Sequence, residues 1–198
     1  MNLKHFRVSL GVFVVASLVL VLGAALIGAS WWLRPISEAE QAMAHGDAKT
    51  ALERYDVARK RFDQVEITKR LLPGIYDLVT ANELSLLYSL QRYDDIIEKA
   101  TTEGGGETAP FWAASAMFDK ALLEEKPEAR MGWVSQSHQQ FRRALDLTPG
   151  DWDAKFNFEL TGKLMNGLKK QPETSKQEMM KILREAPKSQ KQPVKRIG

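Results

Sequence analysis

The chain has 198 residues, among them 28 Lys and Arg, 25 Asp and Glu, 3 His and no Cys. This length is typical of one ordinary domain with an additional segment. The lack of cysteine excludes disulfides, Cys-ligated zinc and thiol catalysis.

The charged residues are distributed unevenly along the chain. Residues 34–162 hold 16 basic and 22 acidic side chains, a balance of 16 − 22 = −6, whereas residues 163–198 hold 10 and 3, a balance of 10 − 3 = +7. The net charge of +3 therefore gives no reason to expect nucleic-acid binding by the folded part.

Residues 8–33 form a run of 26 positions without a charged side chain. As a helix this run is about 39 Å long and exceeds the roughly 30 Å of hydrocarbon in a bilayer, so it predicts a single membrane-spanning helix. Lys4 and Arg7 precede the run, while Glu38 and Glu40 follow it. The positive-inside bias then predicts that the N-terminus is cytoplasmic and that the rest of the chain lies across the membrane.

Trp31, Trp32 and Arg34 are the predicted membrane-interface residues, because the two indole rings lie where the helix leaves the hydrocarbon. The alternative is a cleaved signal peptide, since the small residues at 28–30 offer a cleavage site. The apolar run is longer than the ~7–15 residues of a signal sequence, so we expect an uncleaved anchor over residues 1–34.

The rest of the chain has the periodic apolar pattern of helices. It predicts one hairpin over residues 36–62, a second over 75–100, a third over 111–147 and a last helix over 152–168. The breaks between the helices are marked by turn and capping residues such as Gly46-Asp47, Gln91-Arg92 and Thr148-Pro149-Gly150. No segment alternates like a strand, so the predicted fold class is all-α.

Two of the hairpins share a spaced pattern of small and aromatic residues. It consists of Gly46, Ala51, Tyr55 and Ala58 in the first and of Gly132, Ser137, Phe141 and Ala144 in the third. The pattern resembles the second helix of tetratricopeptide repeats, and the middle hairpin matches it in part. The resemblance implies a short tetratricopeptide-like solenoid over residues 35–168. An unrelated helical bundle is the alternative, and under both interpretations these residues are structural.

Residues 149–160 have the distinctive sequence PGDWDAKFNFEL. This segment resembles the P-x-D-W-D-A-K-[FY]-N-x-E-L segment of small membrane-anchored tetratricopeptide proteins related to MxaK, which accompany MoxR-type ATPases and von Willebrand factor A proteins. The resemblance implies a bacterial inner-membrane accessory protein that helps periplasmic proteins to mature or assemble. In the methanol-oxidation branch, the implied role is to help calcium reach a quinoprotein dehydrogenase.

Stacked helix pairs form a groove that commonly binds peptides or partner domains. The repeat frame places Leu78, Asn82, Ser85 and Tyr88 toward this groove, and it gives Asn157 the same repeat position as Asn82. The resemblance implies that these two asparagines bind the backbone of a peptide. The alternative for Asn157 is a hydrogen bond to a neighbouring helix.

No cluster of residues predicts catalysis or metal binding. His5, His45 and His138 lie in different predicted elements, without the spacing of a metal site. Asp151 and Asp153 are explained better by helix capping than by calcium binding. We therefore expect no catalytic residue, no metal and no cofactor.

Residues 169–198 form a basic end. The pattern at 175–183 predicts a short capped helix, and the sequence after Pro187 is typical of a disordered, solubilising tail, with anionic lipid or nucleic acid as alternative ligands. The predicted function is a non-enzymatic inner-membrane scaffold or assembly factor with a periplasmic repeat domain. A secreted or peripheral peptide-binding protein, released by signal cleavage, is the alternative.

Overall fold

The computed structural model describes residues 3–102 and 106–170, together with residues 179, 181 and 184. Every regular element within these residues is a helix, which confirms that the fold class is all-α. The elements are α1 (Leu3–Ala44), α2 (Ala48–Gln64), α3 (Glu66–Leu71), α4 (Pro73–Ser89), α5 (Tyr93–Thr102), α6 (Ala109–Leu123), α7 (Pro127–Leu147) and α8 (Trp152–Lys170).

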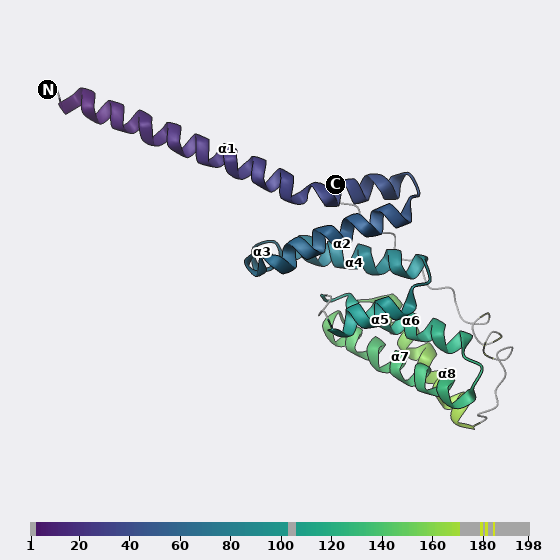
Figure 1. The fold of residues 1–198 in the computed structure, drawn as a ribbon. Helices are drawn as coiled ribbons and strands as arrows, with labels where there is room; N and C mark the ends of the chain where they lie inside the picture. Colours follow the sequence, from purple (N-terminus) through teal and green to yellow (C-terminus); the bar gives the residue numbers. More distant parts are fainter. Residues whose placement is uncertain (1–2, 103–105, 171–178, 180, 182–183, 185–198) are drawn as a thin grey trace.

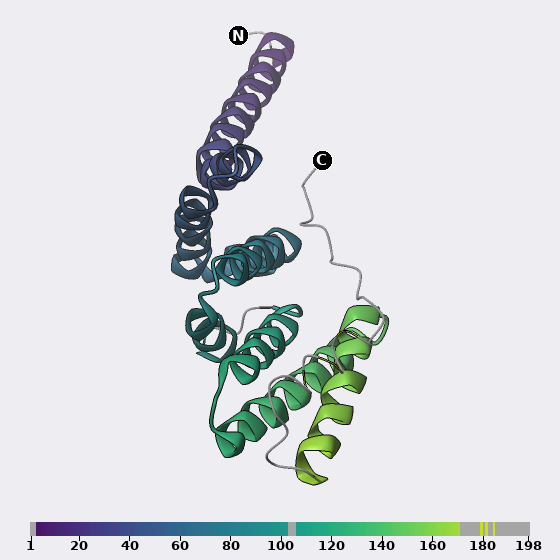
Figure 2. The ribbon, with the colours of Figure 1, turned by 90° about the vertical axis from the view of Figure 1, so that its right-hand side faces the viewer.

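Successive helices pack on one another in a stack (Figures 1 and 2). Helix α2 folds back along the last part of α1, α4 packs on α2, and α6 contacts both α4 and α5. Helix α7 then packs on α6, and α8 packs on α7. The helix bounds agree with the predicted hairpins, while the tetratricopeptide-like solenoid stays a prediction.

The aromatic residues of both spaced patterns lie in the core. Tyr55 is 0% exposed and Phe141 is 2% exposed. The small residue Ser137 donates a hydrogen bond from its Oγ to the carbonyl oxygen of Ala114 at 2.8 Å, which ties α7 closely to α6. The matching glycines differ in position, because Gly46 lies at a turn whereas Gly132 lies inside α7, which begins at Pro127.

Two aspartates cap helices as predicted. The Oδ1 atom of Asp47 accepts a hydrogen bond from the backbone N–H of Thr50 at 3.0 Å, and Oδ1 of Asp151 accepts one from Ala154 at 3.0 Å. These bonds satisfy N–H groups that have no partner inside the first turn of a helix. Before Asp47, Gly46 has a φ of +76°, a left-handed conformation that glycine adopts without steric strain.

Helix α1 contains both the apolar segment and the first helix of the predicted first hairpin, in 42 continuous residues. The predicted domain boundary between residues 34 and 35 therefore falls inside a helix. Pro35 has no N–H group and cannot bond to the carbonyl of Trp31 four residues earlier. Figure 1 shows α1 changing direction between its apolar part and the part that packs on α2, as proline commonly causes.

The apolar part of α1 extends away from the helical stack (Figure 1). Large side chains such as Leu20 and Ile27 are 74% exposed. Within the described residues, α1 is the helix that is long and apolar enough to cross a membrane, as predicted. Its orientation and its retention in the mature protein stay predictions.

Two short helical segments remain, of which the sequence pattern predicted the C-terminal one and did not predict α3. Helix α3 is a short helix between α2 and α4 without a buried residue. Met179, from the predicted C-terminal helix, is helical and 1% exposed, and it belongs to the apolar cluster of Leu164 and Leu168. The predicted capping box and the basic tail lie outside the described residues.

Candidate functional site

Arg61 joins α2 to α1 at the end of the apolar segment. Its Nη1 atom donates hydrogen bonds to the carbonyl oxygens of Trp31 and Trp32 at 2.8 and 2.9 Å, and its guanidinium carbon lies 4.5 Å from the centroid of the Trp31 ring. The Trp31 carbonyl is the one that Pro35 leaves without its helical donor. Arg61 therefore supplies a charge-assisted bond where the helix lacks its own.

The predicted interface residues have different surroundings at this junction. Trp31 is 62% exposed, whereas Trp32 is half-buried and packs edge-on against Phe62 of α2, with ring centroids 6.4 Å apart. The Nε atom of Arg34 donates to the carboxylate of Glu38 at 2.8 Å on the exposed face of α1. Trp31 thus presents its ring outward, while Trp32 helps to hold α2 against α1.

The predicted groove residues lie on two helices, with Asn157 on α8 and the other four on α4. Asn82 is 4% exposed, and its Nδ2 atom donates to the hydroxyl of Tyr55 at 3.0 Å in the core between α2 and α4. The Asn82 amide is therefore not available to a peptide. Asn157 is half-buried on α8, which packs on α7 rather than on α4. Leu78 and Ser85 are half-buried on α4.

Tyr88, the last of the predicted groove residues, belongs to a cluster between α4, α5 and α6. Its ring centroid lies 5.8 Å from that of Tyr93 and 5.6 Å from that of Trp112. The hydroxyls of Tyr88 and Tyr93 donate hydrogen bonds to the carboxylate of Asp119. Burial raises the pKa of Tyr88, and the neighbouring Asp119 raises it further. Burial also raises the pKa of Asp119, against the lowering effect of the two hydrogen bonds.

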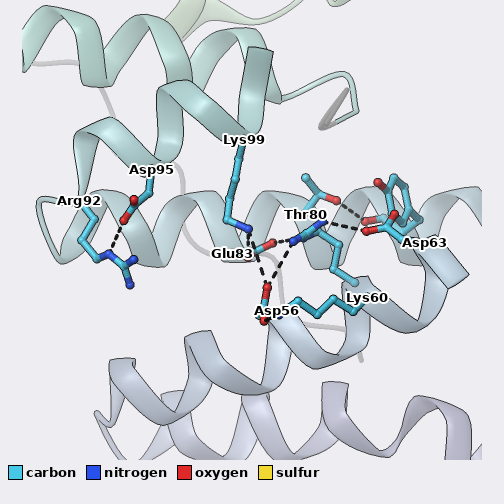
Figure 3. Close-up of polar contacts among 10 residues, drawn as sticks. Asp56, Lys60, Asp63, Thr80, Glu83, Arg92, Asp95 and Lys99 are labelled. Carbon is cyan, nitrogen blue, oxygen red and sulfur yellow. Dashed lines mark hydrogen bonds and ion pairs between the residues drawn. The ribbon is translucent and has the colours of Figure 1, made fainter. Parts of the chain in front are cut away.

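A network of charged side chains connects α2, α4 and α5 inside the stack (Figure 3). The Glu83 side chain is 2% exposed and accepts bonds from Nε of Arg59 at 2.9 Å and from Nζ of Lys99 at 2.8 Å. Arg59, itself 8% exposed, also contacts Asp63 at 2.8 Å and Asp56 at 3.3 Å. Since an unpaired buried charge is costly, these pairings are what make the buried Glu83 tolerable.

Asp56 lies at the edge of this network. Burial raises its pKa, but the hydrogen bond from Lys60 and the charges of Lys60, Lys99 and Arg59 outweigh that effect, so the pKa of Asp56 is lowered overall. The carboxylate therefore stays ionised and balances the surrounding cations. The network therefore joins α2, α4 and α5 through paired charges.

An open surface cleft of about 480 Å³ lies where α5, α6 and α7 meet. Its wall includes the ring of Trp133 with Nζ of Lys120 4.4 Å from the ring centroid, and Lys120 also pairs with Asp94 of α5. Leu123, which is 64% exposed, and Glu124 line the same cleft. This mixture of an aromatic ring, apolar surface and charges of both signs is suited to binding a protein surface.

His138 is an interhelical histidine. Its ring stacks on Phe158 of α8 with centroids 4.2 Å apart, and Nδ1 lies 3.0 Å from the hydroxyl of Thr161. Among the described residues, no group of His, Cys, Asp and Glu is arranged to hold a metal ion.

Comparison of the chain with family models, with curated proteins and with solved structures finds no match.

Sequence reasoning did not predict the contact of Arg61 with the Trp31 and Trp32 carbonyls, here called the Arg61 junction. It also did not predict the charge network around Glu83. Glu83 lies four residues after Val79 and four before Leu87, both of which are buried, so it falls within the apolar stripe of its helix. A charged residue in such a stripe has to find a partner, and this signal was present in the sequence. No local signal identifies Arg61, because its partners are carbonyl groups 29 and 30 residues away.

Proposed function

We propose that this chain is a non-enzymatic scaffold or assembly factor, anchored by α1 in a bacterial inner membrane, with its helical domain in the periplasm. The observation that carries the proposal is the continuity of α1, whose exposed apolar part runs without a break into the helical stack. The Arg61 junction supports it further, because a domain fixed to its anchor presents its binding surface at a defined height above the membrane.

The cleft beside Trp133 is the proposed partner surface. It is formed by α5, α6 and α7, which α2 and α4 separate from α1 in the stack, so a partner in the aqueous space can reach it. The exposed ring of Trp152, 78% accessible with Lys155 against its face at 5.0 Å, is a second and separate aromatic side chain at the start of α8, which follows the opposite end of α7 from the cleft. Aromatic residues are enriched among those that contribute most to protein–protein binding.

The sharper version of the proposal is an MxaK-like role beside a MoxR-type ATPase and a von Willebrand factor A protein, including calcium insertion into a quinoprotein dehydrogenase. It is supported by the segment at residues 149–160. Asp151 caps α8 and Ala154 is buried, so both have structural explanations. Trp152 is 78% exposed and has no such structural role, as expected of a residue that contacts a partner.

Site-specific photo-crosslinking in cells tests the proposal. A photoreactive amino acid replaces Leu123 in one variant and Trp152 in another, and Val57, an exposed residue of α2, is the matched control. We expect a protein adduct from the first two positions that is absent at Val57. Identification of the adduct as a von Willebrand factor A protein or a MoxR-type ATPase would support the sharper version. No adduct at 123 and 152, or the same adducts at Val57, would contradict a partner surface there.

A further inference from the structure

Helix α3 and its flanking residues carry a group of exposed apolar side chains. Ile67 is 57% exposed and Leu71 is 70% exposed, and the flanking Val65 and Leu72 are 37% and 38% exposed. None of the residues of α3 itself is buried. An exposed apolar cluster of this kind on a folded domain is typical of a binding surface.

The place of α3 in the fold indicates what this cluster meets. Arg61, which bonds to the carbonyls of Trp31 and Trp32, sets the end of α2 beside the point where α1 leaves the stack. Helix α3 begins five residues later. Figure 1 shows α3 at the end of the domain from which the apolar part of α1 extends. Since tryptophan prefers the headgroup depth of a bilayer, α3 lies beside the membrane surface wherever Trp31 does.

The two basic residues of α3, which follow the acidic Glu66 of its first turn, also fit a lipid surface. Lys69 and Arg70 lie between Ile67 and Leu71 in the last turn. Lys69 contacts Asp63 at 2.6 Å and the centroid of the Tyr76 ring at 5.0 Å. Arg70 is exposed and forms no ion pair among the described residues. Ile67 and Leu71 are four residues apart and so share one face of the helix, and an apolar face flanked by basic side chains is typical of a helix that lies in a membrane interface.

We propose that α3, with Val65 and Leu72, inserts its apolar side chains into the lipid interface beside the anchor helix. This proposal rests on the membrane anchoring stated under the proposed function. The domain is then held at the membrane by two elements, α1 through the bilayer and α3 on its surface. This arrangement fixes the tilt of the helical stack and directs the cleft beside Trp133 away from the membrane.

Depth-dependent fluorescence quenching tests the proposal on the full-length protein. Because the chain has no cysteine, single substitutions Ile67→Cys and Leu71→Cys can each carry an environment-sensitive fluorophore. The protein is reconstituted into vesicles of phosphatidylcholine and phosphatidylglycerol, with or without nitroxide-labelled lipid. Ser30→Cys in the anchor is the positive control, and Glu53→Cys, on an exposed part of α2 that lies 13 residues before the start of α3, is the negative control.

We expect labels at positions 67 and 71 to be quenched by the nitroxide lipid and shifted to shorter wavelength, as the label at 30 is, while the label at 53 is unaffected. Quenching at 30 without quenching at 67 and 71 would overturn the proposal and leave the anchor intact. No quenching at any position would overturn both this proposal and the membrane anchoring.

Discussion

Replacement of Glu83 by glutamine keeps the shape of a buried side chain but removes the charge that Arg59 and Lys99 share. The wild-type carboxylate accepts bonds at 2.9 and 2.8 Å from these two cations and is 2% exposed. In the variant, one amide oxygen has to serve both donors, and the amide NH₂ faces a cation. The two positive charges then lose their shared counterion in a poorly solvated environment.

The size of this effect follows from the remaining partners. Loss of one member of a buried ion pair costs about 3–5 kcal/mol. Arg59 keeps Asp56 and Asp63, so we expect the low end of that range, about 3 kcal/mol. For a domain of this size, such a loss lowers Tm by about 6–12 °C, since each kcal/mol corresponds to roughly 2–4 °C.

Thermal unfolding of the detergent-solubilised protein, followed by circular dichroism, measures this shift. The matched control is Asp95→Asn, which removes the carboxylate of the exposed Arg92–Asp95 pair beside the network (Figure 3). An exposed pair contributes about 0–1 kcal/mol, so the control should change Tm little. If Glu83→Gln lowers Tm no more than Asp95→Asn does, the buried network does not stabilise the stack as described.

Further substitutions test other parts of the structure. Arg61→Ala should broaden the distance distribution between spin labels on α1 and α2, and an unchanged distribution would contradict the junction. Gly46→Ala should destabilise the protein by about 1 kcal/mol, because the φ of Gly46 is +76°. Gly167→Ala should stabilise it by roughly 0.5–1 kcal/mol, because Gly167 lies inside α8 with open space around the added methyl group. Midpoints of urea unfolding that move in the same direction for both variants would refute this contrast. Burial raises the pKa of Asp119 in the folded state, so proton binding stabilises that state fully below the unfolded pKa of about 4, and the effect is lost as pH rises through the folded pKa. Wild type should therefore lose urea stability relative to Asp119→Asn as pH rises from about 4 to about 7, and a constant difference would contradict the burial of this carboxyl group.

The features that sequence reasoning predicted well are those that local rules determine. Asp47 and Asp151 cap helices because a short acceptor side chain before a helix bonds to its first N–H groups, whatever the rest of the fold does. Tyr55 and Phe141 are buried because the apolar periodicity of a helix identifies the face that meets its neighbour.

The features that were missed depend on contacts between distant residues. The predicted boundary between residues 34 and 35 divided the anchor from the domain, yet α1 continues through Pro35, where Arg61 of the following helix bonds to the carbonyl that proline leaves free. Asn82 was assigned to a groove, although its amide bonds to Tyr55 from the previous hairpin. The partner in each case is 27 or more residues away, and no local pattern identifies it.

An anchored scaffold requires above all that α1 remain attached to the helical domain as a membrane anchor. The intact mass of the protein extracted from bacterial membranes tests this directly. If α1 is retained, the measured mass is that of residues 1–198, 22.3 kDa. A mass lower by about 30 N-terminal residues would show that the apolar part of α1 is removed as a signal peptide, and it would contradict the anchored scaffold in favour of a released peptide-binding protein.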